Sequence, residues 1–259
     1  MSKGNWCMKT DVWPQAAKDF VVAISLLTRL PVPRLPDSAF KRSVRATWAY
    51  PLAGFVAGGI AALVAYVSTF LGLTEGFAAG LSIACLLIVT GALHEDGLAD
   101  VADGFWGGNT PQERLDIMKD SQIGTYGTLA LIVATGLRWL AYAYLLQTSI
   151  AAIVAVAAAS RAILPALMCK LPNARSNGLS HDVGRPDLKH ALVAAGIGLL
   201  LAVTLLGGLG LVVMLSVVLA AFAMGWIARA KISGQTGDVL GATQQIAEVA
   251  ALTALVALT

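Results

Sequence analysis

Long apolar runs alternate with short polar segments along this chain. Most of the runs have about 17 to 25 residues, the length at which an α-helix crosses the hydrocarbon core of a bilayer. Turns and charged connections separate them. The pattern predicts about seven membrane-spanning helices, at residues 48–71, 77–95, 125–146, 150–168, 190–206, 209–228 and 241–258.

Basic residues are restricted to alternate connections of this pattern. The connections between them, such as 72–76 and 147–149, hold no Lys or Arg. Because basic connections stay on the cytoplasmic side of a membrane, we expect a multi-pass membrane protein whose charged connections face the cytoplasm. Every Lys and Arg except Arg138 and Arg161 lies in 1–47, 96–124, 169–189 or 229–240.

Composition agrees with a protein embedded in lipid. Of the 259 residues, 57% are hydrophobic and 13% are charged, and the mean hydropathy is +0.74, which is more apolar than a soluble core requires. The net charge of +3 is small, and no basic stripe with interleaved aromatics occurs, so nucleic acid is not an expected partner. We predict one all-α integral-membrane domain over residues 1–259, a polytopic helix bundle.

Residues 1–47 precede the first predicted span. The stretch "QAAKDFVVAISLLTRLPVPRLP" has an apolar core that is too short to cross a bilayer comfortably. Pro31, Pro33 and Pro36 end any helix formed there. This N-terminal segment is therefore predicted to be cytoplasmic, with a helix that lies at the membrane interface.

An acidic motif, "GALHEDGLADVADGFWGG", follows the second predicted span. If the helix of that span continues, Asp96, Asp100 and Asp103 stand at i, i+4 and i+7 and share one face. Neighbouring carboxylates repel each other, and oxygen ligands favour a hard cation such as Mg²⁺ or Mn²⁺. The motif predicts a metal site with Glu95 beside it, whereas His94 is expected to pack against neighbouring groups because hard ions prefer oxygen.

A short cytoplasmic helix is predicted next. Thr110 at the N-cap, Pro111 at N1 and Glu113 at N3 form the signature of a capping box, and we expect the helix to run to about Ser121.

Four charged residues of this predicted helix are candidates for the site. Asp116 and Asp120 are four residues apart and would share one face, where they could complete the metal cage. Arg114 and Lys119 would meet phosphate oxygens. Residues 94–124 are thus predicted to be the acidic active-site segment, although Asp116 is equally well explained as part of a solvated loop.

Arg138 and Arg161 lie inside predicted spans, where a charge costs about 2.5 to 3.5 kcal/mol and needs a partner or an aqueous cavity. Two roles stay open for them. They are functional candidates, Arg161 as a substrate ligand, or they pair with Glu248 to hold the bundle together.

The last charged connection, "KISGQTGDVLGATQQ", places Gly237 and Asp238 beside a helix start. Such a loop suits backbone contact with a phosphate or a nucleotide, and a simple turn between spans is equally compatible. The segment "NARSNGLSHDVGRPD", with Arg175, is a candidate substrate loop, but its basic residues serve membrane orientation equally well.

Four stretches together resemble a known family. "LLTRLPVP", "DGLADVADGFWGG", "RLDIMKDSQIGTYG" and "GQTGDVLGA" are similar to sequences of cobalamin synthases, the adenosylcobinamide-GDP ribazoletransferases. The resemblance implies a magnesium-dependent inner-membrane enzyme. Its substrates would be adenosylcobinamide-GDP and α-ribazole or α-ribazole 5′-phosphate, and GMP would be released.

The resemblance and the residues suggest roles for individual side chains. We expect Asp96, Asp100, Asp103 and Asp120 to bind one or two Mg²⁺ ions. Glu95 is the expected general base, and Lys119 and Arg114 the expected stabilisers of charge on the transferred oxygens. The expected substrate-binding residues are Arg161, Asp116, Gly237 and Asp238.

Two other functions are weighed against this one. Asp100, Asp103 and Gly104 are also similar to the signature of CDP-alcohol phosphotransferases of lipid synthesis, but the Ala-Arg that follows Asp-Gly in that signature is absent. An ion transporter is the non-enzymatic alternative, although the acids cluster beyond a span and no repeated halves are visible. The sequence leaves the oligomeric state open, including a homo-oligomer.

Overall fold

The computed structural model describes residues 13–259, which form α-helices and a short 3-10 helix. The all-α fold predicted from the sequence is confirmed. The elements are α1 (Gln15–Leu27), α2 (Asp37–Phe40), α3 (Ser43–Ala46), η2 (Thr47–Ala49), α4 (Tyr50–Phe70), α5 (Glu75–Thr90), α6 (Leu93–Gly107), α7 (Pro111–Ile117), α8 (Thr125–Leu145), α9 (Ala151–Ala162), α10 (Leu164–Lys170), α11 (Leu179–Val183), α12 (Leu188–Leu206), α13 (Leu209–Ile232) and α14 (Gly237–Leu258).

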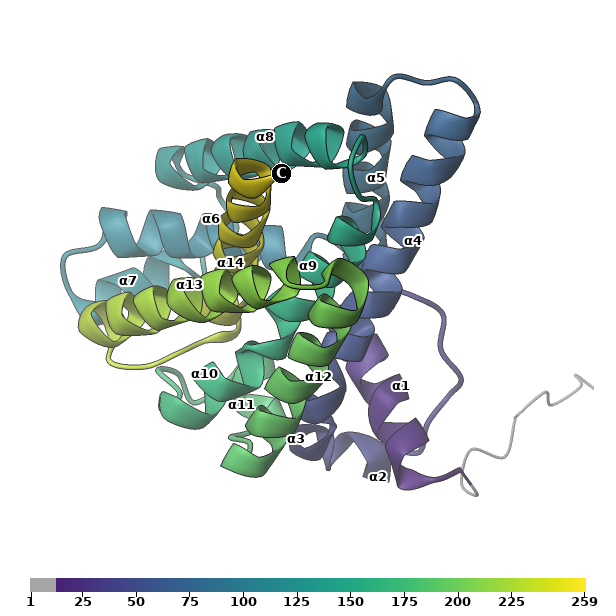
Figure 1. The fold of residues 1–259 in the computed structure, drawn as a ribbon. Coiled ribbons are helices and arrows are strands. Elements are labelled where there is room, and N and C mark those ends of the chain that lie inside the picture. The colour runs from purple at the N-terminus through teal and green to yellow at the C-terminus, as the bar shows by residue number, and fades with distance from the viewer. Residues whose placement is uncertain (1–12) are drawn as a thin grey trace, which may run out of the picture.

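Helix α9 lies at the centre of the bundle (Figure 1). Nearly all of its residues are buried, and most of them are alanines. Helices α4, α12 and α14 pack against it. The backbones approach closely, since a Cβ on Gly54 of α4 would lie 2.9 Å from the Cα of Ala158. Small residues therefore hold the centre together, as they do in many membrane bundles.

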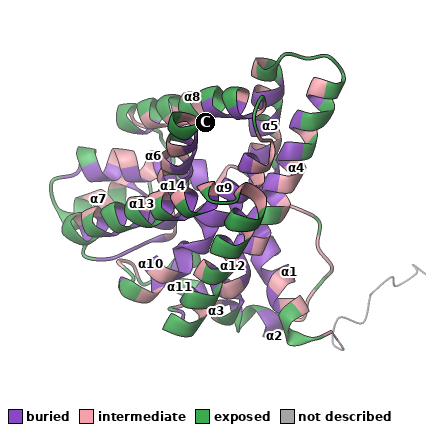
Figure 2. Cartoon of the chain, in the orientation of Figure 1, coloured by how far each residue is buried: buried purple, intermediate pink, exposed green. Residues whose placement is uncertain are grey.

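Six helical segments of the described chain are long and apolar enough to cross a membrane. Exposed apolar side chains such as Leu140, Leu200 and Phe222 cover the outer faces of α8, α12 and α13 (Figure 2), a surface that suits lipid better than water. The predicted polytopic bundle is thus confirmed. The segments are Ser43–Phe70, Thr125–Leu145, Ala151–Lys170, Leu188–Leu206, Leu209–Ile232 and Gly237–Leu258.

The second predicted span differs from the expectation. Helix α5 ends at Thr90, and α6 leaves it at an angle of 88°. The two helices satisfy the length and hydropathy test only as a pair, which would make a seventh, broken span. The bend occurs because Gly91 (φ 64°) and Ala92 (φ 53°) are left-handed, and a left-handed glycine ends a helix. The expected continuous helix from the span into the acidic motif is therefore wrong, although the three aspartates do share α6.

The N-terminal helix is present and ends before the prolines. Helix α1 packs on α3 and α4 and buries Val22, Ile24 and Leu27. Extended chain follows it up to Pro36, as the proline residues predict.

Helix α7 begins as predicted but is shorter than expected. Thr110 Oγ1 accepts a hydrogen bond from the Glu113 backbone N–H (3.2 Å), and the Glu113 carboxylate accepts one from the Thr110 N–H (3.4 Å), which confirms the capping box. The helix ends at Ile117, not Ser121. Asp120 Oδ1 accepts from the Gln122 N–H (3.1 Å), a local bond that competes with helix continuation. Asp120 therefore lies in the loop and does not share a helical face with Asp116.

Helices α6 and α14 cross with their backbones in contact. A Cβ on Gly97 would lie 2.7 Å from the carbonyl oxygen of Asp238, and one on Gly241 would lie 3.3 Å from the Cα of His94. Because Gly97 has no side chain, α14 can approach the backbone of α6 at this position. The crossing brings the acidic motif beside the start of the last helix.

Substitution of Gly97 tests this crossing. Gly97→Ala should lower the free energy of unfolding by about 1 to 3 kcal/mol, because the new methyl group meets backbone that cannot move aside. Thermal unfolding of the full chain in detergent measures the effect. Gly136→Ala in α8 is the matched control, since nothing lies within 4 Å of its Cβ position; equal melting temperatures for the two variants would contradict the close crossing.

Candidate active site

Helix α6 places two of its aspartates along a cleft. Asp96 and Asp100, one helical turn apart, line this cleft from α6, and Lys119 and Asp120 line it from the loop after α7. Its volume is about 530 Å³, within the range of ligand-binding sites. We call it the acidic cleft. It brings together four of the residues that the sequence singles out for metal and phosphate binding.

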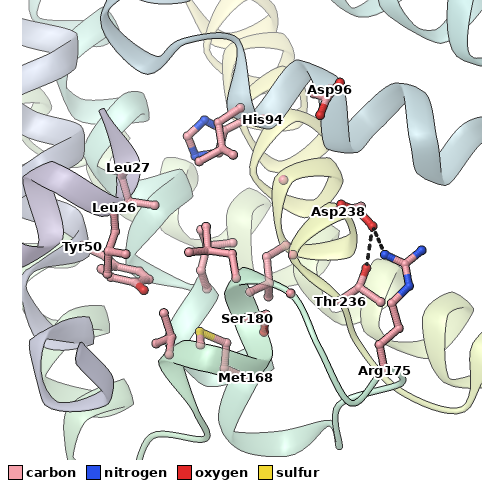
Figure 3. Close-up of a pocket in the computed structure, with 18 of the residues that line it drawn as sticks. Leu26, Leu27, Tyr50, His94, Asp96, Met168, Arg175, Ser180, Thr236 and Asp238 are labelled. Carbon is pink, nitrogen blue, oxygen red and sulfur yellow. Dashed lines mark hydrogen bonds and ion pairs between the residues drawn. The ribbon is translucent and has the colours of Figure 1, made fainter. Parts of the chain in front are cut away.

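Asp96 also lines a second, smaller cavity of about 140 Å³ between α6, α11 and the start of α14. We call it the α14 pocket. Figure 3 shows Asp238, Thr236 and Arg175 together at one end of it and Leu26, Leu27 and Tyr50 at the other. Because Asp96 belongs to both cavities, the two lie next to each other along α6.

The polar end of the α14 pocket is built by one ion pair. Arg175 Nη1 donates to Asp238 Oδ2 (2.9 Å), and Arg175 Nη2 donates to the Leu115 carbonyl oxygen (2.8 Å). Thr236 Oγ1 donates to the same Asp238 oxygen (3.2 Å) and also caps α14 by accepting from the Val239 N–H (3.3 Å). The loop predicted to hold Gly237 and Asp238 at a helix start does so. Arg175, whose role the sequence left open, is the cation that Asp238 contacts.

Negative charge accumulates around Asp100, on the part of α6 that lies outside the six candidate spans. The pKa of Asp100 is raised to about 7, chiefly by burial and in addition by the charges of Asp238, Asp96 and Asp103, while Arg175 opposes the rise. The acids of the two cavities are therefore close enough to affect one another. A cation in the cleft would relieve this repulsion.

Asp103, predicted as a metal ligand, has another role in the structure. Its Oδ2 accepts from the Gly124 N–H (2.7 Å) and its Oδ1 from the Gly127 N–H (2.9 Å), so both oxygens bind the first turn of α8. A carboxylate at a helix N-terminus satisfies backbone donors and complements the helix dipole. Asp103 therefore anchors α8 to α6, and it does not line the acidic cleft with Asp96 and Asp100.

Arg114 and Asp116 lie apart from the two cavities. Arg114 donates to the carbonyl oxygens of Gly108 (3.0 Å) and Lys231 (2.9 Å), so its guanidinium joins α7 to the end of α13. Asp116 is exposed and accepts from Gln112 Nε2 (2.9 Å). These contacts favour the solvated-loop interpretation of Asp116.

Arg138 is the centre of a buried charge network. It donates to Glu95 Oε1 (2.7 Å), to Glu248 Oε1 (3.0 Å) and to Gln245 Oε1 (2.9 Å). The side chains of Arg138 and Glu248 have no exposed surface. Tyr142 donates to Glu248 Oε1 as well (3.1 Å). The pairing with Glu248 that was an open alternative for Arg138 is present.

Glu95 and Arg161 belong to the same buried region. Glu95 Oε1 also accepts from Gln245 Nε2 (3.0 Å), while Oε2 has no hydrogen-bond partner in the structure. Arg161 is 1% exposed and donates to the Ala157 carbonyl oxygen (2.9 Å). Arg161 lines neither cavity, whereas Glu95 lines the acidic cleft. Glu95 therefore connects the buried charge network with the acidic cleft.

The donor chemistry of the acidic cleft suits a hard divalent cation, but no complete cage is preformed. Within residues 13–259, no three His, Cys, Asp or Glu side chains are placed to hold a metal ion by themselves. Mg²⁺ commonly binds through one or two carboxylates together with waters and substrate phosphates. Asp96 and Asp100 provide that smaller set of ligands, and Asp120 offers a further carboxylate from the loop side of the cleft.

Two roles found here were not predicted from the sequence. The pairing of Arg175 with Asp238 joins residues 63 positions apart, and no local pattern indicates it. The anchoring of α8 by Asp103 had a weak signal, because "QIGTYG" begins a helix with no Ser, Thr, Asp or Asn at Gly124 to cap it.

Comparison with known proteins identifies the family. A family model described as cobalamin-5-phosphate synthase matches residues 19–256. The chain belongs to this family. The resemblance seen in the sequence motifs is thereby confirmed. No solved structure matches the chain.

Named relatives of the family cover nearly the whole chain. Proteins named adenosylcobinamide-GDP ribazoletransferase from Bradyrhizobium diazoefficiens, Mesorhizobium japonicum and Brucella canis are 44%, 42% and 42% identical to it. The alignments cover 90%, 92% and 92% of this chain and 91%, 92% and 96% of those proteins.

The role of Asp103 can be tested without substrate. Asp103→Ala should lower the free energy of unfolding by about 1 to 2 kcal/mol in metal-free protein, because two N–H groups of α8 lose their acceptor. Thermal unfolding in detergent with EDTA measures this, and amide exchange at residues 124–127 should rise. Asp103→Asn keeps one acceptor oxygen and should lose less stability than Asp103→Ala. Unchanged metal-free stability in Asp103→Ala would indicate a purely metal-binding role.

The buried network predicts that the stability of the fold depends on the balance of its buried charges. Arg138→Met should lower the free energy of unfolding by about 3 to 5 kcal/mol, because Glu95 and Glu248 are left buried without their cation. The double variant Arg138→Met/Glu248→Gln removes one of the two negative charges and should recover part of the loss. Melting temperatures of the purified variants measure this recovery. A double variant that is less stable than Arg138→Met would contradict the predicted role of charge balance.

Proposed function

We propose that this protein is an adenosylcobinamide-GDP ribazoletransferase that joins adenosylcobinamide-GDP to α-ribazole or α-ribazole 5′-phosphate. A ribose hydroxyl oxygen that is free both in α-ribazole and in its 5′-phosphate forms a bond to the phosphorus next to cobinamide, and the proton of that hydroxyl passes to a base. The bond between that phosphorus and the oxygen of GMP breaks, and GMP leaves. Family membership and the names of the relatives support this reaction.

The observation that carries the proposal is the position of Asp96 between two adjoining cavities. A transferase must hold two substrates with their reacting atoms in contact, and positioning of this kind lowers the barrier greatly. We assign the diphosphate to the acidic cleft, where Lys119 is available to bind its oxygens. Arg175 lies at the adjoining end of the α14 pocket and is the second phosphate-binding cation.

Mg²⁺ is part of the proposal as the cation that neutralises the diphosphate and polarises its phosphorus–oxygen bonds when bound. Asp96 and Asp100 are the residues that would hold it, with Asp120 on the loop side of the same cleft. The chemistry of this donor set also accommodates Mn²⁺.

Glu95 stays our proposal for the base that accepts the hydroxyl proton. Its Oε1 is occupied by Arg138 and Gln245, which leaves Oε2 as the oxygen that can take a proton. We also propose that the two cavities face the cytoplasm of a cell with this protein in its inner membrane. The concentration of Lys and Arg in the connections near them supports that orientation.

An assay for metal-dependent GMP release tests the function. Membranes that hold the protein are incubated with adenosylcobinamide-GDP and α-ribazole, with Mg²⁺ or with EDTA. We expect Asp100→Asn to lower kcat at least about 100-fold, because a carboxylate that neutralises the reacting diphosphate is lost. Binding of Mn²⁺, followed by electron paramagnetic resonance, should weaken in the same variant.

The matched control is Glu75→Gln, another acid-to-amide change at the distant start of α5, which should keep full activity. If EDTA does not reduce the release of GMP, the proposed role of Mg²⁺ is wrong. Absence of release under every condition would overturn the transferase function and return the transporter to consideration.

A further inference from the structure

His94 is a buried polar side chain with no hydrogen-bond partner. It is 2% exposed, and neither Nδ1 nor Nε2 has a partner in the structure. A buried imidazole normally has its N–H paired, because the unpaired group carries a desolvation penalty. His94 lines the α14 pocket, and Figure 3 shows its ring pointing to the side where Leu27 and Tyr50 lie. The unpaired ring therefore faces a cavity.

The inner walls of this pocket are apolar and come from distant parts of the chain. They combine a tyrosine ring, a methionine and several branched aliphatic side chains. His94, the Tyr50 hydroxyl and Ser180 are polar groups among them, and Ser180 already donates to Gln235 Oε1 (2.7 Å). Such a lining suits a flat, largely apolar ligand that carries few hydrogen-bonding atoms. The apolar lining residues are Leu26, Leu27, Tyr50, Leu93, Leu164, Met168, Val183 and Leu240.

The other end of the pocket opens beside the reacting groups. Asp96, Arg175 and Asp238 line that end, and Asp96 continues into the acidic cleft. A nucleoside with its base in the apolar part would direct its sugar towards Asp96, where we place the diphosphate.

We propose that the α14 pocket binds the base of α-ribazole and that an N–H of His94 donates a hydrogen bond to the unsubstituted ring nitrogen of that base. This inference rests on the proposed function. The base is a bicyclic aromatic with two methyl groups and one free acceptor nitrogen, which matches a largely apolar wall in which His94 has no partner of its own. His94 is therefore a specificity residue for the nucleophilic substrate.

Guanine of the other substrate fits this pocket less well. It carries several donors and acceptors around its rings, and most of them would be buried against leucine, valine and methionine without partners. The guanosine is accordingly placed outside the α14 pocket.

A substrate analogue that replaces the free ring nitrogen by C–H makes the test specific. The purified full chain in lipid nanodiscs is titrated with α-ribazole and with this analogue. Wild type should bind α-ribazole about 10- to 100-fold more tightly than the analogue, because the analogue leaves the His94 N–H unpaired. His94→Phe, which keeps a ring of similar size without the N–H, should bind both ligands equally.

Steady-state kinetics give an independent reading. His94→Phe should raise KM for α-ribazole by the same factor and leave KM for adenosylcobinamide-GDP unchanged, while His94→Gln, which keeps an N–H donor, should recover part of the affinity. Ser82→Ala, a buried polar change between α5 and α4, is the control and should keep the preference of wild type. Melting temperatures show whether each variant folds.

Three outcomes would overturn the assignment of the pocket. In the first, folded His94→Phe still prefers α-ribazole over the analogue. In the second, wild type does not distinguish the two ligands. In the third, His94→Phe loses affinity for adenosylcobinamide-GDP and not for α-ribazole. Each of these is compatible with metal-dependent GMP release by wild type, whereas failure of that release would count against the proposed function itself.

Discussion

The candidate site depends on the close contact of two helix backbones. Helices α6 and α14 are separated by about half of the sequence, and they meet where Gly97 faces the backbone of Asp238 and Gly241 faces that of His94. A larger residue at either glycine would separate the helices by the thickness of a side chain. With glycine there, Asp96 and Asp100 on one helix lie near Asp238 on the other. The α14 pocket is lined by both helices of this crossing, and Asp96 links it to the acidic cleft, so the arrangement of the site follows from a packing constraint.

Buried charge then fixes how α6 is turned. Arg138 on α8 binds Glu95 on α6 and Glu248 on α14, so one guanidinium joins the three helices that surround the site. An unpaired charge here would be costly, and the pairing removes alternatives in which α6 is rotated or shifted by a residue. Because Glu95 is held inward by this contact, the next residue, Asp96, is directed to the cavities. Charges that look anomalous in apolar helices thus orient the acidic motif.

The sequence predicted the helices better than it predicted the directions of their side chains. Periodicity and length located the spans, and the capping box located α7, because these signals are local. The bend after Thr90 depended on two left-handed residues, of which Gly91 gave a usable signal and Ala92 none. Helical spacing placed three aspartates on one face. It gave no indication that Asp103 turns to Gly124, because that contact depends on where α8 begins in space.

Contacts between distant residues lay outside what one sequence reveals. Arg175 and Asp238 form an ion pair across 63 positions. Asp238 was singled out for a loop that contacts phosphate or nucleotide and Arg175 for a candidate substrate loop, without any indication that the two residues meet. His94 was expected to pack because hard ions prefer oxygen, and that argument holds for the metal. That argument does not consider a ligand other than a metal ion. Only the fold shows that the ring nitrogens of His94 are unpaired and that the ring lies in a largely apolar pocket.

Charge balance is the reason why we propose a cation in the acid-lined cleft. Asp96, Asp100, Asp120 and Lys119 line the acidic cleft, and Arg175 is already paired with Asp238. Carboxylates outnumber the available cations, so a diphosphate entering alone would be repelled. A divalent ion between the aspartates and the phosphates reverses the sign of that interaction, and it does so most strongly where burial has reduced screening by water. Burial chiefly raises the pKa of Asp100, and the neighbouring acids Asp238, Asp96 and Asp103 add to that rise. The proposal of a metal-dependent transferase therefore rests on the electrostatics of the cleft, and the family supplies the identity of the substrates.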